Sequence, residues 1–173
     1  THKPVIMSTG VATIADIQES VKVLRNNGCK ELILLKCTST YPATPENTHL
    51  LTIPHMRDLY GCPVGLSDHT MGIGASIAAV ALGARVIEKH FTLRRADGGV
   101  DAAFSLEPEE LKALVIESER AFLAMGHVNY ELSEKEQKSL QFKRSLYVVK
   151  NIRAGEAFTS ENVRSIRPAN GLH

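Results

Sequence analysis

Two histidines stand at matching places in this sequence, each at the end of a short apolar run typical of a β-strand. The runs are residues 63–70, which contain His69, and residues 85–92, which contain His90. The apolar segment 72–82 between them has the length of a helix, which predicts two adjacent parallel strands. The carboxyl ends of parallel strands are where α/β proteins bind ligands and perform chemistry. The two imidazoles are therefore predicted to meet at one edge of a sheet.

A hydroxyl and two carboxylates accompany the histidines. Side chains alternate along a strand, so Ser67 shares a face with His69. Glu88 shares a face with His90 for the same reason. An imidazole that binds a metal needs an acceptor for its other ring nitrogen, and Asp68 and Glu88 each stand beside a histidine. We predict a metal site here; the alternative is that each histidine is an ordinary polar residue at a strand end.

Four β-prone runs, each followed by a segment of helix length, predict the elements that position these side chains. The predicted strands are residues 5–10, 31–39, 63–70 and 85–92, and the predicted helices are residues 14–26, 50–60, 72–82 and 107–125. Polar loops after the strands and short loops before them indicate an α/β fold, the C-terminal half of a (β/α)₈ TIM barrel. A flavodoxin-like open sheet is the alternative. Because four strands cannot close a barrel, four further βα units are expected upstream.

The pattern changes after the last of these helices. Residues 1–126 are predicted to form the half barrel, residues 127–141 a polar linker, and residues 142–173 the start of a small second module. Within that module the sequence predicts strands at 145–149 and 163–167 and a short helical cap at 159–162. The module is therefore expected to be rich in β-structure.

The composition excludes several classes of protein. The chain is 43% hydrophobic and 23% charged, and its formal net charge of +1 argues against nucleic acid or an anionic membrane as its main partner. Cys29, Cys37 and Cys62 are odd in number and form no C-x-x-C pair, which argues against a disulfide framework and favours a reducing compartment, the cytoplasm. No apolar run is long enough to span a bilayer.

Several motifs, in order along the chain, resemble the sialic acid synthase family. They are residues 3–10, Cys37-Thr38-Ser39 with Tyr41-Pro42, residues 65–70, and residues 87–92. Members of that family condense phosphoenolpyruvate with an N-acylated amino sugar to make a nine-carbon 2-keto acid. Residues 153–156 and 165–168 resemble the antifreeze-like (SAF) module that follows the barrel in that family. The resemblance therefore covers essentially the whole chain.

The resemblance implies roles for particular residues. His69 and His90 would bind a divalent cation, Mn²⁺ or Mg²⁺, that polarises the aldehyde of the sugar. Glu88 would orient water on the metal or move a proton. The implied substrate-binding residues are Ser8, Ser39 and Ser67 for phosphoenolpyruvate, Tyr41 and Asp101 for the sugar, and Arg167 for the sugar bound to a partner subunit. The last role implies a homodimer in which the C-terminal modules are swapped.

Within the family, residues 95–101 and 104–108 most resemble members that make pseudaminic acid from a 2,4-diacetamido-2,4,6-trideoxy-hexose. Phe104 would supply apolar surface for the deoxy carbon of that sugar; the alternative is that its ring simply packs within the loop. The alternatives are synthesis of legionaminic or N-acetylneuraminic acid, an aldolase-like metal TIM barrel, and a sugar-binding remnant without catalysis. Because the sequence holds only part of the implied active site, this segment by itself is expected to be inactive.

Overall fold

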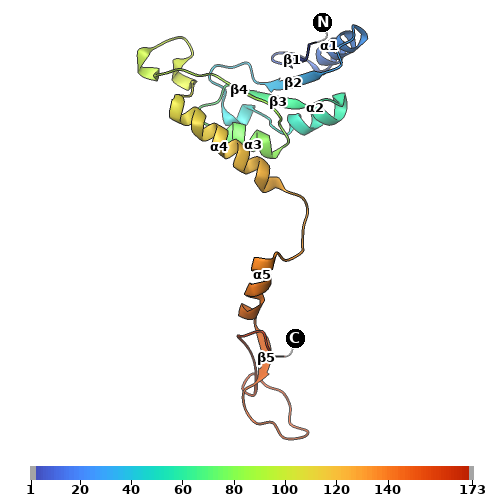
Figure 1. Ribbon diagram of the computed structural model, residues 1–173, viewed down its shortest axis with the longest axis vertical. Coiled ribbons are helices and arrows are strands. Elements are labelled where there is room, and N and C mark those ends of the chain that lie inside the picture. The colour runs from blue at the N-terminus through green and yellow to red at the C-terminus, as the bar shows by residue number, and fades with distance from the viewer. Residues whose placement is uncertain (1–2, 172–173) are drawn as a thin grey trace. The chain divides into compact units, whose positions relative to one another are not determined.

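The strands of the first 126 residues form one parallel sheet in the order β1-β2-β3-β4 (Figure 1). The strands are β1 Val5–Ser8, β2 Leu32–Cys37, β3 Val64–Asp68 and β4 Ile87–Lys89. The helices are α1 Ile14–Asn26, α2 Thr52–Tyr60, α3 Gly74–Ala81 and α4 Pro108–Met125. The computed structural model describes residues 3–171, and the chain divides into two units, Thr1–Gly126 and His127–His173.

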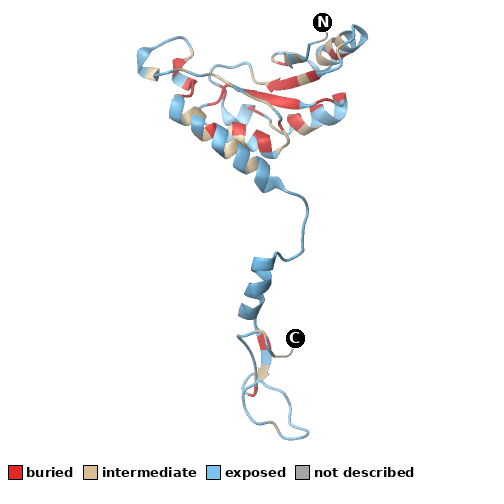
Figure 2. Ribbon diagram, in the orientation of Figure 1, coloured by how far each residue is buried: buried red, intermediate tan, exposed pale blue. Residues whose placement is uncertain are grey.

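One face of this sheet carries the hydrophobic core. Its buried apolar side chains come from alternate strand positions and from α1, α2 and α3, and Figure 2 shows the buried strands and helix sides. The sheet contributes Leu32, Leu34, Val64 and Leu66, and the helices contribute Val21, Ile53, Met56 and Ala79. A flavodoxin-like sheet is doubly wound, with helices on both faces. The sequential strand order and the single covered face therefore confirm the half-barrel prediction.

Short-range signals explain where the helices begin and end. Thr13 precedes α1, and its hydroxyl accepts a hydrogen bond from the Asp16 amide while the Asp16 carboxylate accepts one from the Thr13 amide. Pro108 occupies the first turn of α4, where no backbone donor is needed. Gly61 ends α2 in the left-handed conformation, with φ of 58°. These ends agree closely with the predicted ones because capping is local.

Gly65 in β3 is a position where the fold has no room for a side chain. A Cβ there would lie 2.3 Å from the carbonyl oxygen of Val86 and 2.7 Å from Leu35 Cδ2. In the intact protein, Gly65→Ala is expected to lower the free energy of unfolding by about 1–3 kcal/mol, because the backbone of β4 must move. Urea unfolding measures this. Gly74→Ala is the matched control, since nothing lies within 4 Å of its Cβ. Equal midpoints for the two variants would contradict the close approach.

Three loop regions differ from the sequence prediction. The predicted linker contains a helix, α5 Glu134–Ser139, because Ser133 and Glu136 form a capping box that the prediction overlooked. The loop after β4 contains two 3₁₀ turns, η2 Arg95–Asp97 and η3 Ala102–Phe104. Residues 159–162 form a turn rather than a helical cap. Two further 3₁₀ turns are η1 Pro45–Asn47 and η4 Leu140–Phe142.

The second unit contains two antiparallel strands, β5 Ser145–Val148 and β6 Val163–Ile166. The Tyr147 hydroxyl donates to the Pro168 carbonyl at 2.8 Å, which ties the chain after β6 to β5. The antifreeze-like character of this unit stays a prediction. In the part of the chain that the structure describes, no helix has the length and apolar character needed to cross a membrane.

Candidate functional site

His69 and His90 follow β3 and β4 directly, and the centroids of their rings lie 5.3 Å apart. Backbone amides of residues outside the sheet hold the carbonyl groups of both histidines. The amide of Ala43 donates to the His69 carbonyl at 2.9 Å, and the amide of Leu106 donates to the His90 carbonyl at 2.9 Å. The structure thus brings the two imidazoles together at the carboxyl edge of the sheet.

Ser67 and Glu88 are register partners on the face of the sheet opposite the core. The Ser67 hydroxyl donates to Glu88 Oε1 at 2.6 Å, and its oxygen lies 3.4 Å from His69 Nε2. Alternation along the strands places these three side chains on one face, as the sequence predicts. Because the Ser67 hydroxyl donates its hydrogen to Glu88, Ser67 holds the Glu88 carboxylate in position, and its oxygen also faces the His69 ring.

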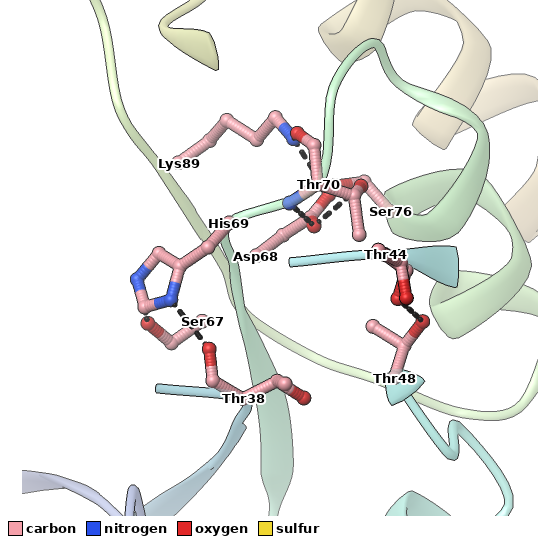
Figure 3. A network of polar contacts seen from close by, with 9 residues as sticks. All are labelled: Thr38, Thr44, Thr48, Ser67, Asp68, His69, Thr70, Ser76 and Lys89. Carbon is pink, nitrogen blue, oxygen red and sulfur yellow. Dashed lines mark hydrogen bonds and ion pairs between the residues drawn. The ribbon is translucent and has the colours of Figure 1, made fainter. Parts of the chain in front are cut away.

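The protonation of His69 follows from its backbone partner. His69 Nδ1 lies 2.8 Å from the carbonyl oxygen of Thr38 (Figure 3). A carbonyl can only accept, so Nδ1 carries the hydrogen and a neutral ring keeps its lone pair on Nε2. The prediction that Asp68 would be the acceptor for His69 is wrong. Asp68 points to the other face of β3, because successive side chains of a strand alternate.

His90 takes its acceptor from a loop rather than from its own strand. Its Nδ1 lies 3.5 Å from Asp101 Oδ2, a distance at which the carboxylate favours a proton on Nδ1. Glu88, the predicted partner, instead accepts from Ser67. Phe104 packs against the His90 ring with 4.9 Å between centroids. The loop after β4 therefore orients this imidazole from two sides.

Asp68 belongs to a buried polar network on the core side of the sheet (Figure 3). Its carboxylate accepts hydrogen bonds from the amide and hydroxyl of Thr70, from Ser76 and from Lys89. Burial alone would raise the pKa of Asp68, but these donors outweigh it and hold the pKa below its usual value. The sequence analysis missed Lys89 and Thr38, although the alternation of Lys89 with Glu88 and His90 was a usable signal.

The aromatic residues of the site differ in exposure. Tyr41 is 56% exposed, and its ring centroid lies 4.3 Å from that of His69 and 6.0 Å from that of His90. Phe104 is only 5% exposed and lies 6.0 Å from the Tyr41 ring. Tyr41 therefore presents a ring surface beside the histidines, whereas Phe104 is buried against the His90 ring.

Two predicted residues, Ser8 and Ser39, have no hydrogen bond to this cluster among residues 3–171, and a third, Arg167, lies in the other unit. Ser8 is exposed at the end of β1. Ser39 Oγ lies 3.8 Å from Cys37 Sγ, beside the backbone of Gly10. Arg167 belongs to the second unit, where it lines an open cleft of about 550 Å³ with Arg144 and Arg164. Ser8 and Ser39 share the strand edge with the histidines without a direct contact to them.

The two histidines have donor atoms that fit a divalent cation. Each ring has a polar neighbour at Nδ1, which favours Nε2 as the metal-binding atom, and the Ser67 oxygen lies 3.4 Å from His69 Nε2. Within residues 3–171, no group of three or more His, Cys, Asp or Glu side chains is close enough to hold a metal ion. A metal bound by this pair would need further ligands such as water and substrate oxygens, as Mg²⁺ and Mn²⁺ accept readily.

Comparisons with known proteins find relatives over nearly the whole chain. The model of the NeuB family matches residues 1–130. Pseudaminic acid synthase of Campylobacter jejuni is 44% identical over 171 residues, 99% of this chain and 50% of that protein. N,N'-diacetyllegionaminic acid synthase of the same organism is 44% identical over 174 residues, 99% of this chain and 52% of that protein. N-acetylneuraminic acid synthetase of Leptospira borgpetersenii has a TM-score of 0.71 at 38% identity, over 80% of this chain and 48% of that chain. The chain thus spans about half the length of these relatives.

Proposed function

The chain belongs to the NeuB family, and on that premise we propose that it supplies the metal-binding half of an active site that condenses phosphoenolpyruvate with an N-acylated amino sugar. The observation that carries the proposal is the pair His69 and His90, at the ends of neighbouring strands with a polar acceptor beside Nδ1 of each ring. The identity to curated synthases over 99% of the chain supports the same reaction.

In the proposed reaction, C3 of phosphoenolpyruvate forms a bond to the aldehyde carbon of the open-chain sugar, the C=O π bond breaks, and the former aldehyde oxygen takes up a proton from solvent to become a hydroxyl. Water adds to the cationic C2, and the tetrahedral intermediate expels phosphate as the C2–O bond breaks. A divalent cation, Mn²⁺ or Mg²⁺, supplies Lewis acidity toward the aldehyde oxygen when it is bound. Glu88 lies on the same sheet face as the histidines and accepts the proton that the attacking water loses, while Ser67 holds its carboxylate in place.

Substrate binding is assigned to residues around this centre. Ser8 and Ser39 hold the oxygens of phosphoenolpyruvate from the ends of β1 and β2. The Ser67 hydroxyl donates its hydrogen bond to Glu88. Toward phosphoenolpyruvate, Ser67 therefore acts as a hydrogen-bond acceptor rather than a donor. Tyr41 offers its exposed ring to the sugar, and Asp101 has one carboxylate oxygen near His90 and its other oxygen available for a sugar hydroxyl.

We propose a 2,4-diacetamido-2,4,6-trideoxy-hexose of the L-altro type as the acceptor, which gives pseudaminic acid. A legionaminic acid precursor is the second candidate, because the pseudaminic and the N,N'-diacetyllegionaminic acid synthases of Campylobacter jejuni are each 44% identical to this chain. Phe104 is 5% exposed, so it offers only a small surface to the deoxy carbon of either sugar.

A competition assay tests the function and the acceptor together. The intact protein, given phosphoenolpyruvate, Mn²⁺ and equal amounts of the L-altro sugar, a legionaminic acid precursor and N-acetylmannosamine, is expected to release phosphate and form mainly pseudaminic acid. Mass spectrometry identifies the product. Preference for another sugar would overturn the acceptor assignment, and absence of phosphate release with every sugar would overturn the synthase assignment.

The second unit is proposed to be the start of an antifreeze-like module that covers the active site of a partner subunit in a homodimer. Arg144, Arg164 and Arg167 line one cleft, and none of the three forms an ion pair within residues 3–171. Unpaired guanidinium groups are suited to donate hydrogen bonds to carbonyl and carboxylate oxygens. Arg167 is the residue proposed to reach the acyl group of the sugar.

A further inference from the structure

Asp68 and Lys89 form an ion pair on the core side of the sheet, directly behind the two histidines. They are register partners in β3 and β4, and Lys89 Nζ lies 2.9 Å from Asp68 Oδ2. Their side chains are 0% exposed for Asp68 and 3% for Lys89. In the sequence, His69 directly follows Asp68, and His90 directly follows Lys89. The ion pair is therefore the last link between the two strands before the histidines.

The same network also closes the turn that carries His69. Asp68 Oδ1 accepts from the Thr70 amide and from the Thr70 hydroxyl, each at 2.8 Å. Lys89 Nζ donates to the Thr70 carbonyl as well as to Asp68. Residues 68 and 70, on both sides of His69, are thus held by one lysine of the strand that carries His90. A displacement of either strand end would have to break these bonds.

The network is not expected to add much to the stability of the fold. Taking an ammonium and a carboxylate out of water is costly, and apolar replacements of buried ion pairs are often neutral or stabilising. Directional bonds do, however, fix the relative position of the groups they join. On the other face, Ser67 and Glu88 link the preceding register position at 2.6 Å. Successive register positions are therefore joined by side chains on alternating faces, up to the histidines.

We propose that Asp68 and Lys89 are positioning residues that fix the separation and orientation of His69 and His90 from the opposite face of the sheet. This inference rests on the proposed function, since it assigns the pair to the geometry of the proposed metal site. Neither residue touches the metal or a substrate. Their effect passes through the backbone of the two strand ends.

Lys89→Met in the intact protein is the direct test, with Mn²⁺ affinity measured by electron paramagnetic resonance of the free ion. The affinity is expected to fall about 10- to 100-fold, as for the loss of other groups that orient metal ligands. Ser76→Ala is the matched control: it removes a 2.6 Å bond to the same carboxylate oxygen but leaves the bridge to Lys89 intact. Its affinity is expected to stay within about threefold of the unmodified protein.

Asp68→Asn combined with Lys89→Met guards against misfolding, because the single variant leaves a charged carboxylate without its partner. The double variant is expected to fold and to show the same loss of Mn²⁺ affinity. Unchanged affinity in a folded double variant would refute the proposal. Loss of the fold in both variants would also refute it, because the pair would then be structural.

A metal-free measurement separates this inference from the proposed function. In protein with labelled histidine, the nuclear Overhauser effect between the His69 and His90 rings is expected in the unmodified protein and in Ser76→Ala, and to be lost in the double variant. If the unmodified protein binds no Mn²⁺, the metal assignment fails, and this ring contact alone decides whether Asp68 and Lys89 position the histidines. Retention of the contact in the double variant would show that they do not.

Discussion

Replacing His69 by alanine in the intact protein is expected to abolish Mn²⁺ binding and to lower turnover by about 1,000-fold or more, because a Lewis acid contributes several kcal/mol to the transition state. His69 is the better of the two histidines to test. Its Nδ1 is held by the Thr38 carbonyl at 2.8 Å, so its Nε2 has a defined direction and protonation. Phosphate release from phosphoenolpyruvate measures turnover, and calorimetry measures Mn²⁺ binding.

His55→Ala is the control for this experiment. His55 is an exposed residue of α2, which packs on the core face of the sheet, opposite the face that carries the histidines, and its loss is expected to leave both measurements unchanged. Circular dichroism should show the same helix content for both variants, since the His69 ring lies on the face of the sheet opposite the core cluster. Normal Mn²⁺-dependent turnover in His69→Ala would show that the metal assignment is wrong.

Mixing inactive His69→Ala and Arg167→Ala subunits is expected to restore activity. If Arg167 serves the partner's active site, one of the two sites in a mixed dimer combines an intact His69 from one subunit with an intact Arg167 from the other. An equal mixture that associates at random is expected to regain about a quarter of the activity, since half of the dimers are mixed and each has one complete site. Phosphate release after subunit exchange measures this.

An arginine that acts within its own subunit gives the opposite result. Each subunit of the mixed dimer then lacks either His69 or Arg167 at its own site, so no complete site forms and the mixture stays inactive. Arg153→Ala provides the control, because Arg153 is an exposed residue of the same unit and is expected to be active without mixing. Failure of the mixture to regain activity, with mixed dimers verified by mass spectrometry, would overturn the swapped arrangement.

The sequence located the elements well because the signals for them are local. The apolar strands, the Thr13 cap and the Pro108 start need only neighbouring residues, and the structure has them within a few positions of the prediction. Alternation along β3 and β4 likewise placed Ser67, Glu88 and the histidines on one face. A local signal was overlooked at Ser133, whose capping box starts a helix inside the predicted linker.

Which polar group each histidine contacts was decided by the tertiary structure. The acceptor for His69 is the carbonyl of Thr38, 31 residues earlier, and the carboxylate near His90 is Asp101 in the following loop. Neighbourhood in sequence suggested Asp68 and Glu88 instead. Polar contacts need atoms only a few Å apart, and neighbours in sequence do not provide them here. The pairing of β2 with β3 brings Thr38 to His69, and the path of the loop after β4 brings Asp101 to His90. Alternation along β3 could have excluded Asp68 as the acceptor for His69, because it places Asp68 on the opposite face of the sheet. On that face, the pairing of β3 with β4 provides Lys89 as the partner of Asp68.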